Sequence, residues 1–209
     1  MMKTIDEIFS DVTLIGQTPS LIAKAKLPEK IFDEVKAWID PCRAIKDDEY
    51  RELLNHRNAG TGHNSYQVSV PRRLIDNSFF LGYICHFGNL YINLYGTNVD
   101  IREKYSRKVQ MRNYPGHFDG YDCWVNFTYK GDDNPRHNHA GILSSIIYIK
   151  DKDCQPTIFP TIDYVHEPEE GEILLFPSEL EHYVDKKETE SERISASFNL
   201  DYINFNPLQ

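Results

Sequence analysis

The chain contains few cysteines and no long apolar run. Its 209 residues include four cysteines, at positions 42, 85, 123 and 154, and no two of them form a Cys-x-x-Cys pair. That spacing excludes a zinc ribbon and a dithiol redox motif. The apolar runs are too short for a transmembrane helix, and the first residues lack the basic and apolar regions of a signal peptide. We therefore expect a cytoplasmic protein with reduced thiols and no membrane partner.

Basic residues are also scarce. The chain has 23 Lys and Arg against 32 Asp and Glu, which gives a formal net charge of −9. Binding to a phosphate backbone needs clustered Lys and Arg, so we expect no nucleic-acid partner. An acidic surface can attract a basic protein substrate, but it more commonly serves solubility. The hydrophobic content of 40% and the charged content of 26% are typical of a soluble globular protein.

The second half of the chain consists of short strand-like segments separated by Gly, Pro, Asn and Asp. Many short strands with turn signals between them predict a sandwich or a barrel. We expect two facing antiparallel sheets with Greek-key links, which is a jelly roll or double-stranded β-helix. The expected strands span residues 108–112, 122–129, 142–150, 157–159, 172–176, 183–186 and 194–202.

The first half of the chain has a mixed character. Short strands are expected at residues 12–15 and 21–25, and helices at 28–38, 47–57 and 71–94. Pro28 suits the start of the first helix, and Asp40-Pro41 is expected to end it. No linker rich in Pro, Gly or Ser divides the halves. We therefore predict one mainly β domain over residues 1–209. In it, residues 1–95 form a helical and mixed buttress for a jelly-roll core at 96–209.

Three histidines carry the strongest chemical signal. His137 and His139 stand two apart, and side chains two apart on a strand share a face, so both can bind one metal ion from one side. His182, from a distant strand, would complete a facial set with open positions, as in non-heme iron oxygenases, which usually have two histidines and one carboxylate. Arg193, eleven residues later, could hold a carboxylate-bearing cosubstrate by a bidentate contact.

Two segments, residues 137–151 and 171–199, read HNHAGILSSIIYIKD and GEILLFPSELEHYVDKKETESERISASFN. Together they resemble the 2-oxoglutarate/iron(II) dioxygenase superfamily, most closely a family of predicted oxygenases from bacteria and phages and more distantly the prolyl 4-hydroxylases. The resemblance covers roughly residues 120–202. It departs from the superfamily at His139, where Asp or Glu is usual, so the charge balance and the identity of the metal stay open.

The resemblance implies an enzyme that uses iron(II), 2-oxoglutarate and molecular oxygen to hydroxylate a substrate. His137, His139 and His182 would be the metal ligands. Arg193 and Ser195 would bind the distal carboxylate of 2-oxoglutarate, and Tyr148 could donate its hydroxyl to the same carboxylate. Asn126, which shares a strand face with Trp124, could bind the other end of the cosubstrate or order a water. For a phage protein the location would be the host cytoplasm.

Several alternatives stay open at this point. His117-Phe118-Asp119 is a literal His-x-Asp pair, although the flanking glycines favour a turn there. A cupin-like enzyme with three histidines would use another metal without 2-oxoglutarate, and a jelly roll with a relict site would be a non-catalytic binding or structural protein. The substrate is unidentified, with a peptide or protein side chain suggested by analogy alone. Homo-oligomers are compatible with the sequence.

Overall fold

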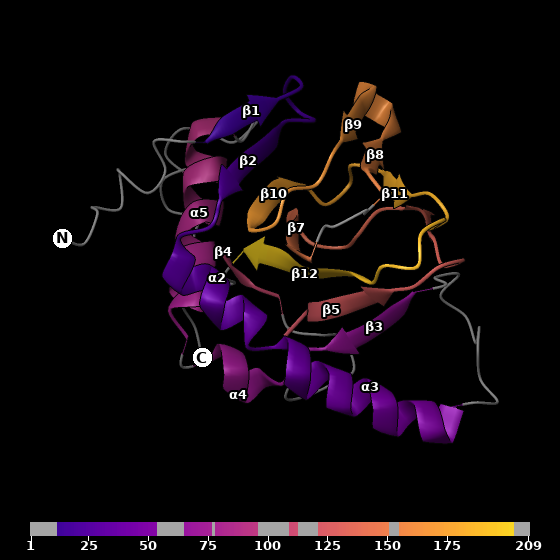
Figure 1. Cartoon of the computed structure of the whole chain (residues 1–209). Coiled ribbons are helices and arrows are strands. Elements are labelled where there is room, and N and C mark those ends of the chain that lie inside the picture. The colour runs from indigo at the N-terminus through magenta and orange to yellow at the C-terminus, as the bar shows by residue number, and fades with distance from the viewer. Residues whose placement is uncertain are drawn as a thin grey trace.

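The computed structural model describes residues 12–53, 65–76, 78–95, 109–112, 121–150 and 155–202. Within these residues two antiparallel sheets face each other, and helices cover the outer face of the larger sheet (Figure 1). The larger sheet has the strand order β1-β2-β10-β7-β12-β5-β3, with β4 also paired to β12. The smaller sheet has the order β6-β11-β8-β9. Strands distant in sequence are thus neighbours, and the prediction of a mainly β jelly roll is confirmed.

The strands of the larger sheet are β1 (Thr13–Ile15), β2 (Ile22–Lys26), β3 (Tyr66–Ser69), β4 (Val109–Met111), β5 (Cys123–Thr128), β7 (Leu143–Lys150), β10 (Glu172–Pro177) and β12 (Arg193–Tyr202). The smaller sheet contains β6 (Asn134–His137), β8 (Thr157–Phe159), β9 (Tyr164–His166) and β11 (His182–Val184). The helices are α2 (Glu29–Lys36), α3 (Ile39–Leu53), α4 (Arg72–Ile75) and α5 (Phe79–Tyr95), with a 3-10 turn η1 (Pro160–Ile162).

Both faces of the larger sheet are buried, and the sequence of β12 shows how. Successive strand side chains point to opposite faces, so apolar and polar positions that alternate are sorted onto two sides. The apolar set packs under the helices, where Phe198 meets Phe80 of α5 edge-on at 5.6 Å between ring centroids. The polar set faces the smaller sheet. The apolar set consists of Ile194, Ala196, Phe198 and Leu200, and the polar set consists of Arg193, Ser195 and Ser197.

The predicted helix boundaries need two corrections. Asp40-Pro41 does not end the first helix, because α2 already ends at Lys36 and Pro41 lies in the first turn of α3. Proline is tolerated there, since its missing N–H would have no partner within the helix. The predicted helix at 47–57 corresponds to the later part of α3, as far as the structure describes it.

The expected helix at 71–94 is interrupted between α4 and α5. Ser78 Oγ donates to the Ile75 carbonyl at 2.6 Å and accepts from the Leu81 N–H at 3.3 Å, which is the role of a helix N-cap. The Glu34 carboxylate of α2 accepts the backbone N–H groups of Phe79 and Phe80. A side chain from another helix therefore stabilises the start of α5, and no local periodicity reveals this.

Three strands were not predicted: β3, β6 and β9. Each is three or four residues long and pairs at or near the border of its sheet. The segment between the predicted strands 122–129 and 142–150 contains β6, which forms through pairing with β11. Residues before 95 thus contribute β1, β2 and β3 to the larger sheet in addition to the helices.

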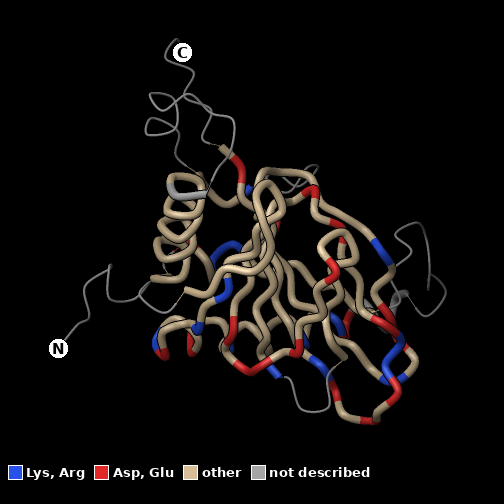
Figure 2. Tube along the Cα trace, turned by 90° about the horizontal axis from the view of Figure 1, so that it is seen from above, with Lys and Arg blue, Asp and Glu red and all other residues tan. Residues whose placement is uncertain are grey.

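Charged residues lie mainly outside the two sheets. Lys and Arg positions are interspersed with Asp and Glu positions along loops and helices, and the central strands are mostly uncharged (Figure 2). Between the sheets, Tyr148, Phe159, Leu174 and Phe176 form a second apolar cluster with their neighbours. None of the described helices is long and apolar enough to cross a membrane. Because apolar side chains cluster between the sheets, the polar groups that are buried there need a chemical explanation.

Candidate metal centre

The three predicted histidines meet at one end of the space between the sheets. His137 ends β6 and His182 begins β11, and the two are register partners across the smaller sheet. His139 follows β6, and its backbone N–H donates to the Ser178 carbonyl just after β10 at 2.9 Å. The potential ligand atoms of the three imidazoles lie within 4.8 Å of one another. One metal ion could therefore contact all three.

The local geometry differs from the strand geometry that the sequence predicted. His137 and His139 do not share a face of one strand, because β6 ends at His137. His139 is held instead by its backbone contact with Ser178, a residue of the turn that leads to His182. The imidazoles converge because the chain turns between the sheets after β6, and the ring centroids of His137 and His139 are 4.8 Å apart.

Two of the imidazoles are oriented for metal binding through Nε2. His137 Nδ1 lies 2.7 Å from the Pro135 carbonyl oxygen, and His182 Nδ1 lies 3.1 Å from the Leu180 carbonyl oxygen. A carbonyl oxygen only accepts, so each Nδ1 carries a proton, and in the neutral ring the lone pair is then on Nε2. Such outer contacts fix the tautomer of metal-binding histidines. The donor set therefore fits a divalent metal, with three neutral nitrogen ligands in place of two and a carboxylate.

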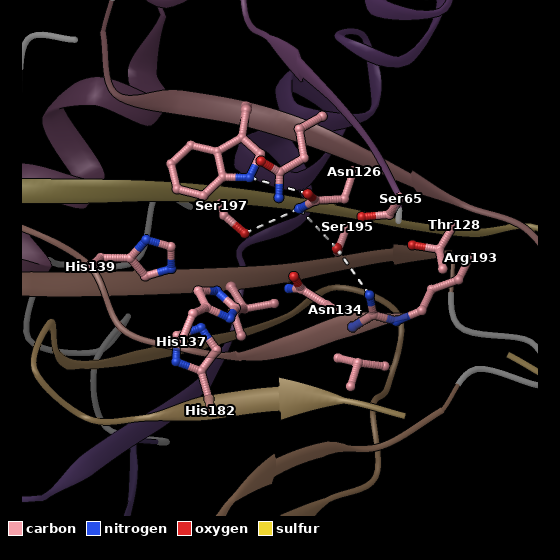
Figure 3. Close-up of a pocket in the computed structure, with 14 residues that line it drawn as sticks. Ser65, Asn126, Thr128, Asn134, His137, His139, His182, Arg193, Ser195 and Ser197 are labelled. Atoms are coloured by element: carbon pink, nitrogen blue, oxygen red, sulfur yellow. Dashed lines mark hydrogen bonds between the residues drawn. The ribbon is translucent and has the colours of Figure 1, made fainter. Parts of the chain in front are cut away.

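The histidines open onto a cleft that is partly continuous with solvent. Figure 3 shows the histidines at one end of this cleft and Arg193 at the other, with hydroxyl and amide groups between them. None of the described lining residues is acidic. They are Ser65, Gln67, Trp124, Asn126, Thr128, Asn134, His137, His139, Ile146, His182, Val184, Arg193, Ser195 and Ser197.

Arg193 is a buried cation at the far end of the cleft. Its side chain lies on β12 and is 5% exposed, and Nη1 is 3.4 Å from Ser195 Oγ. Nε is buried without a hydrogen-bond partner, and no carboxylate of the described residues forms an ion pair with this guanidinium. The neighbouring Glu192 pairs with Arg43 and Lys150 instead. An uncompensated buried charge is costly, so this end of the cleft fits the carboxylate of a bound anion.

Tyr148 lies beneath Arg193 rather than in the wall of the cleft. The guanidinium carbon of Arg193 is 5.7 Å from the centroid of the Tyr148 ring. The Tyr148 hydroxyl donates to Thr157 Oγ1 at 2.7 Å, and burial raises the pKa of this phenol. In this arrangement Tyr148 supports Arg193 through its ring face, a cation–π contact, while its hydroxyl is bonded to Thr157.

His166, for which the sequence offers no metal partner, lies beside Tyr148. Its ring centroid is 5.2 Å from that of Tyr148, and its Nδ1 is 2.9 Å from the Tyr164 hydroxyl. Its Nε2 lies 3.1 Å from the Glu172 carboxylate without the alignment of a hydrogen bond. Burial, followed by the charge of Lys24, lowers the pKa of His166 from 6.5 to about 4. The contact with Glu172 is therefore that of a neutral imidazole and not an ion pair.

The depressed pKa of His166 predicts a loss of stability in mild acid. The unfolded chain takes up the proton near pH 6.5, whereas the folded chain does so near its pKa of about 4. The contribution of the neutral His166 to the free energy of unfolding is complete above pH 6.5, and it falls by about 3 kcal/mol as the pH drops to 4. Urea unfolding at pH 7 and pH 4.5 measures it. His166→Gln, which cannot be protonated, should lose clearly less stability between these pH values than the wild type; equal losses would contradict the assignment.

Several lining residues were not predicted from the sequence. Gln67 comes from β3, a strand that the sequence pattern does not indicate, and Ser65 precedes it. Ser197 continues the period of two that begins with Arg193 and Ser195, so the alternation in the sequence could have revealed it. Thr128 and Asn134 lie at the end of β5 and the start of β6. The rival pair His117 and Asp119 lies outside the described residues.

Comparisons with known proteins give a partial family match and support the fold. A family model described as "Putative 2OG-Fe(II) oxygenase" matches residues 158–199. No curated protein matches the chain. The crystal structure of AviO1 from Streptomyces viridochromogenes Tue57 is similar, with a TM-score of 0.51 at 10% identity, covering 97% of this chain and 94% of that one. This similarity supports the jelly-roll fold.

Two further structures have slightly lower TM-scores. The 2OG complex of the viral collagen prolyl hydroxylase from Paramecium Bursaria Chlorella virus-1 has a TM-score of 0.48 at 14% identity, covering 86% of this chain and 94% of that one. A Pseudomonas putida prolyl-4-hydroxylase has a TM-score of 0.47 at 16% identity, covering 85% and 91%. The family match includes His182, Arg193 and Ser195. The predicted resemblance to 2-oxoglutarate/iron(II) oxygenases is therefore confirmed by the family model over residues 158–199.

Proposed function

We propose that this protein is an iron(II)- and 2-oxoglutarate-dependent oxygenase that hydroxylates a peptide or protein side chain. The observation that carries the oxygenase chemistry is the pairing, in one cleft, of three clustered imidazoles with a buried arginine that has no described anionic partner. A metal ion would bind to the histidines at one end of the cleft, and a dicarboxylate bound beside it would pair with Arg193 at the other end. A metal alone would not explain the arginine that lacks a described anionic partner, and an anion alone would not explain the histidine cluster.

The lining of the cleft supports the substrate class. Apart from Arg193 and the histidines, the described lining residues are neutral, and most carry hydroxyl or amide groups. Peptide groups are neutral donors and acceptors, so they can pair with such a surface without bringing a charge into the cleft. The substrate would approach through the side open to solvent. The net charge of −9 would favour a basic segment, chiefly through the rate of encounter.

The residues of the chain divide the work between them. His137, His139 and His182 would hold the iron, and the carbonyls of Pro135 and Leu180 keep two of these rings in the required tautomer. Arg193 and Ser195 would bind the distal carboxylate of 2-oxoglutarate, and Asn126 would line the path between the two ends. When bound, iron and 2-oxoglutarate together supply the oxidation of a substrate C–H bond with molecular oxygen.

Anaerobic titration of the iron-loaded protein with 2-oxoglutarate tests the proposal. Binding at the metal should produce a charge-transfer absorption band that saturates at one equivalent. Admission of oxygen should then release succinate, faster in the presence of a substrate peptide, whose mass should rise by one oxygen atom. The wild type without iron serves as the control. Absence of the band in iron-loaded protein would contradict the use of 2-oxoglutarate.

A cupin-like enzyme is the second candidate, and one observation favours it. The donor set consists of three histidines, with no carboxylate at the position of His139. Such an enzyme would bind a metal without 2-oxoglutarate, and Arg193 would then serve a different anion. The same titration separates the two candidates, because only the metal would bind stoichiometrically in a cupin-like enzyme.

His139 is the position at which the metal set departs from the usual pattern. We expect His139→Asp to retain iron, because a carboxylate is an acceptable ligand for iron(II) there and restores the common two-histidine set. His139→Ala should weaken iron binding strongly, since the metal loses one of three ligands. Metal competition assays on both variants measure the affinities. Unchanged affinity in His139→Ala would mean that His139 is not a ligand and that another group, for example Asp133, completes the site.

A further inference from the structure

Four side chains on β5 and β12 form a row between the metal centre and Arg193. In the register of the two strands, Asn126 is opposite Ser195 and Trp124 is opposite Ser197. All four line the cleft. Trp124 also lies beside the metal centre, with its ring centroid 5.5 Å from that of His139. The row therefore connects the two ends of the cleft through side chains alone.

The hydrogen bonds of this row have a fixed direction. The indole N–H of Trp124 can only donate, and it lies 3.1 Å from Asn126 Oδ1. The carboxamide of Asn126 must therefore present its oxygen to Trp124 and its NH₂ group to β12. There, Nδ2 lies 3.4 Å from Ser195 Oγ and 3.3 Å from Ser197 Oγ. Figure 3 shows these contacts along the wall of the cleft.

Ser195 Oγ receives a second donor, because Arg193 Nη1 lies 3.4 Å away. A hydroxyl oxygen has two lone pairs, and both are directed at donors here. The hydroxyl proton of Ser195 must then point elsewhere, and no described residue accepts it. Ser195 is 2% exposed, so an unused donor at this position is costly unless a ligand accepts it.

We infer that Trp124 and Asn126 are positioning residues that fix the Ser195 hydroxyl as a donor toward the carboxylate of the cosubstrate. This inference rests on the proposed function. The direction of donation matters because a carboxylate only accepts, whereas a carboxamide presents both donors and acceptors. If Trp124 did not hold the Asn126 oxygen, the carboxamide could turn over. Ser195 would then donate to Asn126 and lose its preference for an anion.

Two substitutions test the direction of these hydrogen bonds, with 2-oxoglutarate and its distal (C5) monoamide as probes. Trp124→Phe keeps an aromatic ring and removes the N–H. It should weaken 2-oxoglutarate binding about three- to tenfold, as the loss of one hydrogen bond does. Asn126→Asp keeps the shape, offers a second acceptor to Ser195 and adds a negative charge, and it should weaken 2-oxoglutarate more than tenfold. In Trp124→Phe, which changes no charge, a fall in the ratio of acid affinity to amide affinity tests the direction of the hydrogen bonds.

Anaerobic calorimetry on iron-loaded protein measures these affinities, and iron affinity without cosubstrate should stay unchanged in Trp124→Phe. The matched control is Trp38→Phe, which alters the other tryptophan, in the core against Phe80. A general loss of packing would weaken acid and amide alike and leave their ratio unchanged, which would overturn the inference. Wild-type affinity and ratio in both variants would also overturn it. A wild type that binds neither probe would overturn the proposed function and the inference together.

Discussion

Alanine at His182 or at His137 is expected to abolish stoichiometric binding of iron(II). Each substitution removes one of three nitrogen ligands whose atoms lie within 4.8 Å of one another. Loss of a ligand should exceed the roughly 10–100-fold loss of affinity that follows removal of an outer contact of a metal-binding histidine. Iron content after anaerobic loading and desalting, together with a competition titration, measures the effect.

The fold should survive both substitutions. The larger sheet does not contain these residues, and His182 packs against Phe159 and Phe176 at the edge of the aromatic cluster. Far-UV circular dichroism should therefore match the wild type. His86→Ala is a suitable control, because His86 belongs to α5 on the other face of the larger sheet. If His117→Ala removes iron and His137→Ala does not, the rival His-x-Asp pair is the true metal site.

The larger sheet was predictable because its strands carry their pattern in the local sequence. In β12, apolar and polar residues alternate, so one face packs under the helices and the other meets the smaller sheet. Arg193 begins this strand, whereas His137 and His182 lie on strands of the smaller sheet and His139 follows one of them. Residue type and order are therefore enough to indicate both ends of the cleft. Gly171, with a positive φ of 81°, forms the turn before β10.

The remaining features depend on pairings between distant segments. The strand β6 has the sequence NPRH, which has no strand pattern of its own and becomes a strand by pairing with β11. The break between α4 and α5 depends on Glu34 from another helix. The hydroxyl of Tyr148, predicted to reach the cosubstrate, is bonded to Thr157 because β8 lies beside it. Contacts of this kind are set by tertiary structure, which overrides local propensity.

The direction of the hydrogen bonds in the cleft also could not be predicted from the local sequence. Trp124 and Asn126 could be assigned to one strand face from the sequence. Their relation to Ser195 and Ser197 follows from the register of β5 against β12, which has no local signature. Types of side chain indicate which chemistry is available. The register decides which atoms donate and which accept.

Replacing Arg193 by alanine is expected to weaken 2-oxoglutarate binding about 10–100-fold. Arg193 is buried and forms no ion pair with the described residues, so its guanidinium is available to a ligand carboxylate. A hydrogen bond to a charged group contributes about 1.5–3 kcal/mol, and about 1.4 kcal/mol corresponds to a factor of ten. Arg193→Lys keeps the charge but loses the planar fork, so its affinity should fall between those of the alanine variant and the wild type.

Two further measurements distinguish this anchoring role from a structural one. Iron affinity without cosubstrate should hardly change in Arg193→Ala, because Arg193 is not a metal ligand. Arg193→Met, which keeps the bulk without the charge, should be at least as stable as the wild type without ligand, because it removes an uncompensated buried cation. It should, however, lose the thermal stabilisation that 2-oxoglutarate gives to the metal-loaded wild type. Lys130→Ala, which removes a positive charge from an exposed ion pair with Glu190, serves as the control for net charge. If Arg193→Ala binds 2-oxoglutarate as tightly as the wild type, the carboxylate is anchored elsewhere in the cleft and the role proposed for Arg193 is wrong.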